Sequence, residues 1–219
     1  LIRQLGCGLY SGGRVAFANA GKVDCFGKGL EKIQTKNKDF NSIVSEASSL
    51  KYLLTKFSNL FPTVVYHSKE LLIIDFIENN NIRNNKFQKI LADNILKIHK
   101  VTNNKYGFKF DTQIGGLKQS NKFSDNWLDF FRDNRLNMIF VKINKNKPMP
   151  NLINKRIEKL LKNLGDIIPN KPKVSLLHGD LWSGNILFNN GKLVGLIDPG
   201  VYFGHNELEI SYLTWFKYV

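Results

Sequence analysis

The apolar positions in the first part of the chain change their period twice. Residues 40–57 carry apolar side chains at spacings of three and four, which predicts an amphipathic helix. Short apolar runs typical of strands lie on either side of it, at about 14–18, 23–30, 63–66 and 71–77. Four polar residues separate the last two runs, so these two predict a hairpin. The first part is therefore expected to be mostly β-structure with one helix.

From residue 78 onward, the apolar positions mostly follow a helical period. The amphipathic segments predict helices at about 86–100, 123–138 and 151–164. Val174–Leu177 is short and mostly apolar, which is typical of a buried strand. The change of pattern divides the chain into a first lobe, residues 1–77, and a second lobe, residues 78–219.

Residues 186–197 contain the clearest hairpin, because two apolar runs there are separated by Asn190-Gly191. Asn-Gly supplies the positive φ angles that a two-residue type I′ turn requires. Such a turn pairs Asn185 with Leu196, so that Asn185 and Asp198 lie at the same open end of the hairpin. Side chains at these positions come within about 5–8 Å of each other.

A third polar group enters the same end of the hairpin, because Asp180 precedes Asn185 by five residues. Carboxylate and carboxamide oxygens suit a hard cation such as Mg²⁺. Taken singly, each of these residues is commonly a turn or cap residue. Together, His-x-Asp, Asn, a hairpin and a final Asp form the layout of a kinase catalytic loop. In that layout the first Asp accepts the proton of the attacking hydroxyl, and Asn185 and Asp198 hold the metal.

Phosphoryl transfer also needs a cation on the nucleotide phosphates and an anion that fixes this cation. Lys28 ends the strand-like segment Cys25-Phe-Gly-Lys28, and Glu46 borders the apolar stripe of the predicted helix. We therefore expect an ion pair between Lys28 and Glu46. Lys32 and Lys36 are the alternatives if the strand is out of register, and a solvated Glu46 is the other interpretation of that residue.

The charge of the chain first suggests a different class of function. Thirty-two Lys and Arg against 18 Asp and Glu give a net charge of +14, which invites a nucleic-acid or anionic-surface partner. However, 26 of the 32 basic residues are scattered Lys, and Asn also occurs 26 times. AT-rich coding produces this composition, whereas phosphate-reading surfaces favour Arg. We expect no specific nucleic-acid partner.

Other features exclude membrane and disulfide-rich classes. The chain lacks the run of about 20 apolar residues that crosses a bilayer, so no membrane partner is expected. Its two cysteines, Cys7 and Cys25, cannot form a disulfide framework, and a cytoplasmic setting is predicted. The oligomeric state has no signature in the sequence.

The chain resembles the fructosamine kinases (ketosamine-3-kinases), a branch of the protein-kinase-like and aminoglycoside-phosphotransferase group. The segments that carry the resemblance are His178-Gly-Asp-Leu-Trp-Ser-Gly-Asn185, Leu196-Ile-Asp-Pro-Gly200 and Tyr202-Phe-Gly-His-Asn-Glu207. Supporting matches are Glu46–Leu50 and Trp127–Phe131. The resemblance implies a two-lobe, protein-kinase-like α+β fold with a small β-rich N-lobe and a helical C-lobe.

The same resemblance implies an activity: transfer of phosphate from ATP, with Mg²⁺, to the 3-hydroxyl of a free or protein-bound ketosamine. Asp180 is then the catalytic base, and Asn185 and Asp198 are the metal ligands. On the nucleotide side, the implied residues are Lys28 and Glu46 as the phosphate anchor, Asp75, Phe76 and Ile77 as the adenine hinge, and Gly6 and Gly8 in the phosphate loop. On the acceptor side they are Trp182, as a wall for the sugar, and His205.

Three departures from the family pattern bear on these expectations. The glycine loop, Gly6–Gly13, has fewer adjacent glycines, and Glu209 stands where the family more often has Asp. The helices that normally follow Trp215 are missing, so we expect a fold truncated at its C-terminus. The alternatives are another small-molecule kinase of the aminoglycoside or choline type, a non-catalytic kinase-like module, and a polyanion-binding protein.

Overall fold

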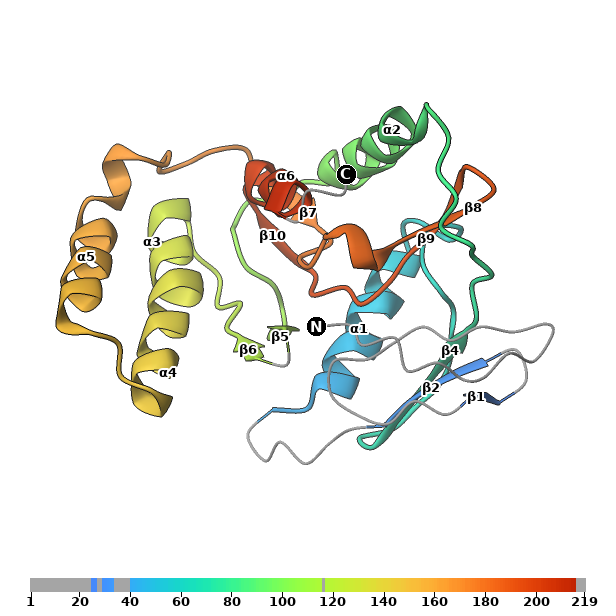
Figure 1. The fold of residues 1–219 in the computed structure, drawn as a ribbon, viewed down its shortest axis with the longest axis horizontal. Helices are drawn as coiled ribbons and strands as arrows, with labels where there is room; N and C mark the ends of the chain where they lie inside the picture. The colour runs from blue at the N-terminus through green and yellow to red at the C-terminus, as the bar shows by residue number, and fades with distance from the viewer. Residues whose placement is uncertain (1–24, 27–28, 34–39, 116, 216–219) are drawn as a thin grey trace.

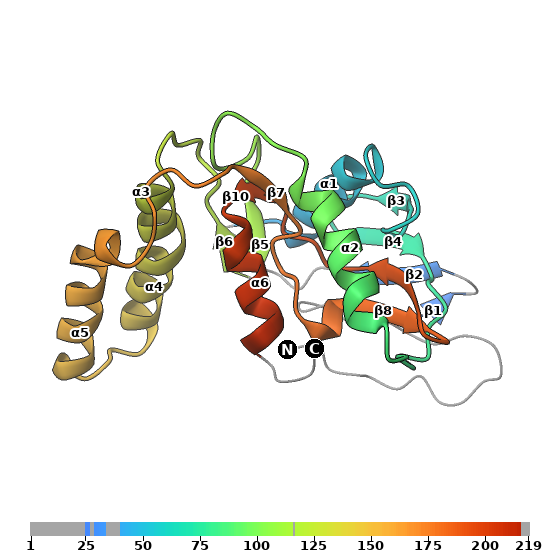
Figure 2. The ribbon, with the colours of Figure 1, turned by 90° about the horizontal axis from the view of Figure 1, so that it is seen from above.

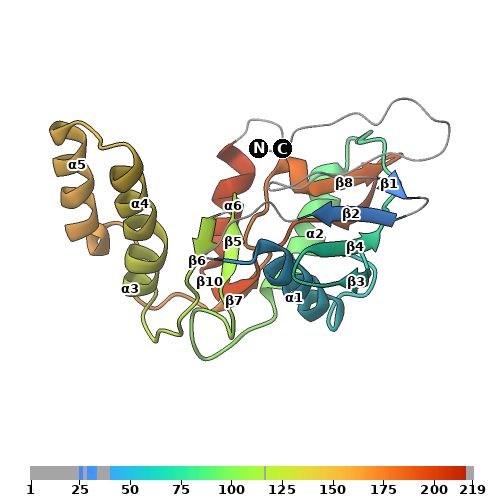
Figure 3. The ribbon, with the colours of Figure 1, turned by 90° about the horizontal axis from the view of Figure 1, so that it is seen from below.

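The computed structural model describes residues 25–26, 29–33, 40–115 and 117–215. Its first part contains a four-stranded antiparallel sheet in the order β1-β2-β4-β3. These strands are β1 (Cys25–Phe26), β2 (Gly29–Ile33), β3 (Val64–His67) and β4 (Leu71–Asp75). The helix α1 (Ser42–Leu54) packs beside β3 and β4 (Figure 3). The β3–β4 hairpin that the sequence predicts is confirmed.

The first helix forms where the apolar stripe predicts it, although it is shorter. It begins after Asn41, whose side chain accepts a hydrogen bond from the backbone N–H of Val44 at 3.0 Å and so caps the first turn. Ile43, Ala47, Leu50 and Leu53 are buried at spacings of four, three and three. This stripe places α1 between the sheet and the rest of the molecule.

The predicted strand at residues 23–30 is wrong. Instead, β1 and β2 pair antiparallel, with Phe26 opposite Gly29, so the chain reverses direction between these two residues. Glycine weakens the interior of a strand, and Gly27 and Gly29 lie within the predicted run. The neighbour of β4 on the side away from β3 is consequently β2, which pairs with β4 from Gly29 to Ile33. The predicted strand at 14–18 lies outside the described residues.

The second part of the chain is mainly helical, with three two-stranded sheets. The sheets pair β5 (Thr112–Ile114) with β6 (Leu117–Gln119), β7 (Ser175–Leu177) with β10 (Tyr202–Gly204), and β8 (Ile186–Asn189) with β9 (Lys192–Leu196). The helices are α2 (Phe87–His99), α3 (Trp127–Phe131), α4 (Met138–Asn146), α5 (Asn151–Lys162) and α6 (Asn206–Trp215). Short 3₁₀ turns occupy Leu164–Asp166 and Ser183–Asn185. Helices at 86–100 and 151–164 are thus confirmed.

The helix predicted at 123–138 is instead a longer helical segment from α3 to α4. Asn126 caps its start, and a π-helical stretch, Arg132–Asn137, joins the two α-helices. The buried guanidinium of Arg135 lies 4.7 Å from the ring centre of Phe130 and 4.1 Å from that of Tyr202. These contacts attach the segment to β10. Beyond them, α4 and α5 lie apart from the sheet at the opposite end of the molecule (Figures 1 and 2).

The β8–β9 hairpin has the predicted turn, with φ of 49° at Asn190 and 78° at Gly191. Its register differs from the prediction, because a bulge shifts the pairing between Leu187 and Phe188. Leu196 therefore pairs with Ile186 and not with Asn185. The two strands nevertheless remain joined at that end, since Ile197 N–H donates to the carbonyl of Asn185 at 3.0 Å.

One apolar core runs through both parts of the molecule. It includes side chains from α1 and β4 as well as from α2, β7, β8 and β9. The hairpin β8–β9 lies beside the segment that leads from β4 to α2, where the backbone N–H groups of Asn80 and Asn81 donate to the carbonyl of Phe188 (Figure 1). None of the described helices is both long and apolar enough to cross a membrane.

Candidate active site

The loop His178-Gly179-Asp180 leaves the buried strand β7 and passes very close to a second loop. Gly179 has a φ of +86°, a conformation that favours glycine. A Cβ atom at this position would lie 2.0 Å from the carbonyl oxygen of Gly200. Gly200 N–H in turn donates to the carbonyl of His178 at 2.9 Å. The loop that carries Asp180 is therefore held directly against the chain that follows Asp198.

Asp180 and Asn185 are in contact, as the spacing in the sequence predicts. The amide nitrogen Nδ2 of Asn185 donates to the backbone carbonyl of Asp180 at 2.8 Å and approaches its carboxylate Oδ2 at 3.4 Å. Asn185 is buried, with 1% of its surface exposed, and its own backbone N–H donates to the carbonyl of Trp182. These bonds close the loop around the carboxylate of Asp180.

Asp180 lies close enough to Asp198 for the charge of Asp198 to affect the pKa of the Asp180 carboxyl. The pKa of the Asp180 carboxyl is raised to about 7, mainly by burial and also by the negative charge of Asp198, while the hydrogen bond from Asn185 acts to lower it. Asp198 itself has a φ of +55°, which turns the chain sharply after β9. The two carboxylates thus share one partly dry site.

His178 supports the loop from within the core. It is fully buried, its ring stacks on Phe61 with centres 6.1 Å apart, and its Nδ1 accepts a hydrogen bond from the N–H of Asp180 at 3.3 Å. Burial lowers the pKa of its imidazole. A neutral, buried ring in this position positions Asp180 and is poorly placed to exchange protons with solvent.

The residues expected to hold Mg²⁺ carry one unsatisfied acceptor. The side-chain oxygen Oδ1 of Asn185 is buried and accepts no hydrogen bond from the part of the chain that the structure describes. A buried acceptor of this kind is costly unless it binds a ligand. The described residues contain no group of three or more His, Cys, Asp and Glu that could hold a metal. The donor set therefore fits a cation held by one or two protein oxygens together with phosphate groups, as Mg²⁺ commonly is.

The expected nucleotide residues come from α1 and from the end of β4. Glu46 is buried, with 3% of its surface exposed, which excludes a solvated glutamate. The N–H of Asp75 is already bonded to the carbonyl of Thr63 at 2.9 Å. A Cβ on Gly195 would lie 2.4 Å from the Cδ1 atom of Ile77, so the predicted hinge packs directly on β9. Lys28, Gly6 and Gly8 lie outside the described residues.

This site lies on a chain that matches a known family over most of its length. The model of the fructosamine kinase family matches residues 29–219. The chain belongs to the fructosamine kinase family. It is 31% identical over 147 residues to the chloroplastic protein-ribulosamine 3-kinase of Arabidopsis thaliana, a match that covers 66% of this chain and 44% of that protein.

Solved structures of the family share the fold of this chain. Crystal structures from Haemophilus somnus and Thermobifida fusca, both provisionally named fructosamine-3-kinases, have TM-scores of 0.73 and 0.76 at 25% and 21% identity. The matches cover 86% of this chain, and 64% and 65% of those chains. The predicted protein-kinase-like α+β fold is thereby confirmed. The chain spans less than two thirds of the length of each of these three relatives.

The two residues expected on the acceptor side of this fructosamine kinase family member lie in different surroundings. The indole of Trp182 is half-buried and covers Gly184, where a Cβ would lie 2.3 Å from the ring. His205 instead packs edge-on against the buried ring of Trp127, with centres 6.2 Å apart, and burial lowers the pKa of its imidazole. Trp182 thus contacts the loop that carries Asp180, whereas His205 packs against α3.

His99 belongs to none of the sequence motifs, and Glu209 stands out in the sequence merely as a departure from the family pattern. The carboxylate of Glu209 accepts a hydrogen bond from the N–H of Gly179 at 2.7 Å and contacts Nε2 of His99 at 2.8 Å. The available signal was a histidine that continues the apolar stripe of Leu91, Ile95 and Ile98 in α2. A polar side chain on a buried helical face requires a partner, but its identity emerges from the fold alone.

Proposed function

We propose that this fructosamine kinase family member transfers the γ-phosphoryl group of ATP to the 3-hydroxyl of a ketosamine. The observation that carries the proposal is the convergence of Asp180, Asn185 and Asp198 at one end of the β8–β9 hairpin. The name of the Arabidopsis relative, a protein-ribulosamine 3-kinase, supports the ketosamine class and a protein-bound acceptor.

In this proposal Asp180 orients the acceptor hydroxyl and takes up its proton as the oxygen attacks the phosphorus atom. A base works best when its pKa lies near the working pH, and the pKa of Asp180 is raised to about 7. Asn185 and Asp198 would hold Mg²⁺ through their side-chain oxygens. Bound there, Mg²⁺ supplies neutralisation of the charge that develops on the phosphate oxygens.

The lysine that pairs with Glu46 is, in our proposal, Lys32 in place of Lys28. In kinase folds this lysine lies within the strand of the N-lobe sheet that precedes the helix carrying the glutamate. The strand before α1 is β2, in which Lys32 occupies the position opposite Leu72 of β4. Lys28 precedes that strand. The shift arises because the chain reverses between β1 and β2.

We further propose that adenine binds at Phe76 and Ile77, between a first lobe of residues 1–77 and a second lobe of residues 78–219. Asp75 contributes less to adenine binding than predicted, because its backbone N–H already donates to the carbonyl of Thr63. Trp182 would supply a flat apolar surface for the sugar, and His205 would shape the acceptor side through Trp127. A cytoplasmic setting stays a prediction, and the Arabidopsis relative is named as chloroplastic.

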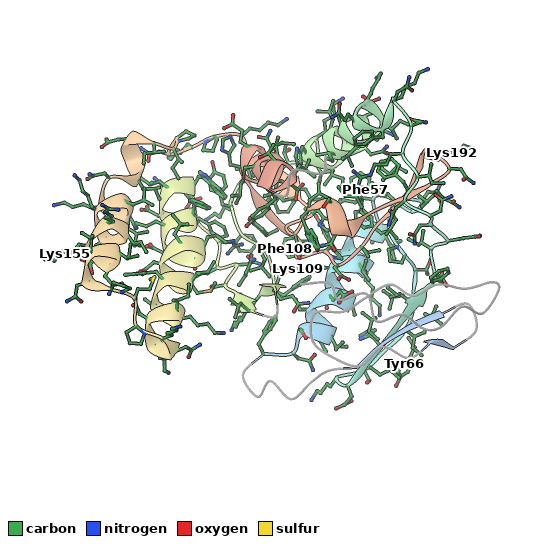
Figure 4. All side chains as sticks on the ribbon, viewed as in Figure 1. Phe57, Tyr66, Phe108, Lys109, Lys155 and Lys192 are labelled. Carbon is green, nitrogen blue, oxygen red and sulfur yellow. The ribbon has the colours of Figure 1, made fainter. Side chains whose placement is uncertain are left out.

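The distribution of lysines favours this proposal over a polyanion-binding function. Lys155 projects from α5 at one end of the molecule, whereas Lys192 is the first residue of β9 and lies at the other end (Figure 4). These two lysines thus lie on distant surfaces. A polyanion-binding protein would show an affinity for nucleic acid that falls steeply with salt concentration.

The test is ADP formation from MgATP with a panel of acceptors: fructosyl-lysine, ribulosyl-lysine, an aminoglycoside and choline. We expect turnover with a ketosamine, and expect Asp180→Asn to lower kcat by about 100- to 10,000-fold while MgATP affinity changes little. Transfer to the aminoglycoside or choline alone would indicate the other kinase class. Binding of MgATP without transfer would indicate a non-catalytic module, and unchanged turnover in the variant would remove Asp180 from the mechanism.

A further inference from the structure

A buried pair of polar side chains connects α2 to the catalytic loop through α6. Glu209 of α6 and His99 at the end of α2 have side chains that are 1% and 8% exposed. Nε2 of His99 lies 2.8 Å from Oε2 of Glu209, and the other oxygen, Oε1, accepts the N–H of Gly179 at 2.7 Å. The three groups therefore form one continuous chain of contacts that ends next to Asp180.

The geometry of Glu209 requires both contacts. A buried carboxylate is costly unless its oxygens are hydrogen-bonded, and here each oxygen has its own donor when Nε2 of His99 carries a hydrogen. Without His99, Oε2 would be buried without this partner, and the side chain would gain freedom to turn away from Gly179. The hydrogen bond to the loop thus depends on a residue that does not touch the loop.

The other end of this chain of contacts is rigid. His99 follows Leu91, Ile95 and Ile98, which are buried in the core, and α2 packs against β7 and β9. These two strands precede Asp180 and Asp198 in the sequence. A group fixed to α2 is therefore a suitable reference point for the position of the loop between them.

We infer that His99 is a positioning residue for Asp180, acting through Glu209 and the N–H of Gly179. The inference rests on the proposed function, because it assigns to the pair the task of holding the proposed base. Gly200 restrains the loop from the opposite side through its bond to the carbonyl of His178. Together, the two restraints set the backbone at Gly179, and Asp180 is the next residue.

The experiment compares His99→Met, which removes the donor, with His99→Gln, which keeps a side-chain N–H. His67→Met, a histidine substitution in β3 outside the site, is the control. The first readout is the split between kcat and KM for MgATP with a ketosamine. We expect His99→Met to lower kcat at least about ten-fold with little change in that KM, because small displacements of a catalytic group are costly. His99→Gln should stay within about three-fold of the wild type.

The second readout is amide hydrogen exchange in the peptide around residues 176–181, which reports the Gly179 N–H without requiring activity. His99→Met should speed exchange in this peptide at least about ten-fold relative to β3–β4, and the other two variants should not. If the wild type phosphorylates no ketosamine, the proposed function fails. Amide hydrogen exchange still tests whether His99 holds the Gly179 N–H in place through Glu209. Equal behaviour of His99→Met and wild type, equal losses in Met and Gln, or global unfolding of His99→Met would each overturn the inference.

Discussion

The raised pKa of Asp180 has a consequence for folding stability. In the folded chain this carboxyl holds its proton up to about pH 7, whereas its ordinary pKa is 3.8. The folded state thus binds more protons than the unfolded state between these values, so stability falls as the pH rises from about 4 to about 7. Above that range, the ionised Asp180 is a destabilising group that the fold retains.

The size of the effect follows from the gap between the two pKa values. Each pKa unit corresponds to about 1.36 kcal/mol, so the gap between 3.8 and about 7 amounts to at most about 4 kcal/mol at pH 8. Asp180→Asn removes this penalty, since the amide does not ionise. Even half of that gain, about 2 kcal/mol, raises Tm by about 4–8 °C in a chain of this size.

The assay is thermal and urea unfolding of the wild type and Asp180→Asn at pH 5, 6, 7 and 8, without magnesium. Asp93→Asn is the matched control, because Asp93 is exposed and pairs with Lys89 across one helical turn, at 2.8 Å. That control should change the free energy of unfolding by less than about 0.5 kcal/mol. A gain in Asp180→Asn that is absent at pH 8, or that does not shrink toward pH 5, would refute the reasoning.

Two further predictions concern the same loop and hairpin. Gly179→Ala should lower the free energy of unfolding by more than about 3 kcal/mol in urea titrations, because its Cβ would lie 2.0 Å from the Gly200 oxygen. Gly115 has a φ of +54° and open space around it, so Gly115→Ala should lower the free energy of unfolding by only about 1–2 kcal/mol. An equal loss of stability in the two variants would contradict the steric argument. Asn185→Ala should raise the Mg²⁺ concentration for half-maximal turnover by about 10- to 100-fold, and an unchanged Mg²⁺ titration would exclude Asn185 as a ligand.

The contacts of the loop could be predicted from the sequence because they depend on near neighbours. Asp180 and Asn185 are five residues apart, and Asn190-Gly191 dictates a tight turn that returns the chain toward Asp198. The spacing of apolar residues along a helix is also a local signal, and α2 and α5 lie within two residues of their predicted bounds. Such features follow from backbone preference and the periodicity of apolar side chains.

The remaining features depend on residues that are distant in the sequence. The pairing of β8 with β9 shifts by one residue between Leu187 and Phe188, and the Asn190-Gly191 turn does not predict this shift. His99 and Glu209 are separated by 110 residues, so no local pattern links them. The reversal between β1 and β2 was missed for another reason: an apolar run interrupted by glycines fits one strand or two.

The helices α4 and α5 give the molecule an uneven distribution of stability. Neither contains a buried residue, and Val141 and Leu152 are 56% and 62% exposed. Opening this end of the molecule therefore removes little apolar surface from the core, so it needs less free energy than global unfolding. By contrast, the loop at Asp180 lies between buried strands. Under mild denaturation or protease, the α4–α5 end should open and be cut first, while Asp180, Asn185 and Asp198 stay folded against the apolar core.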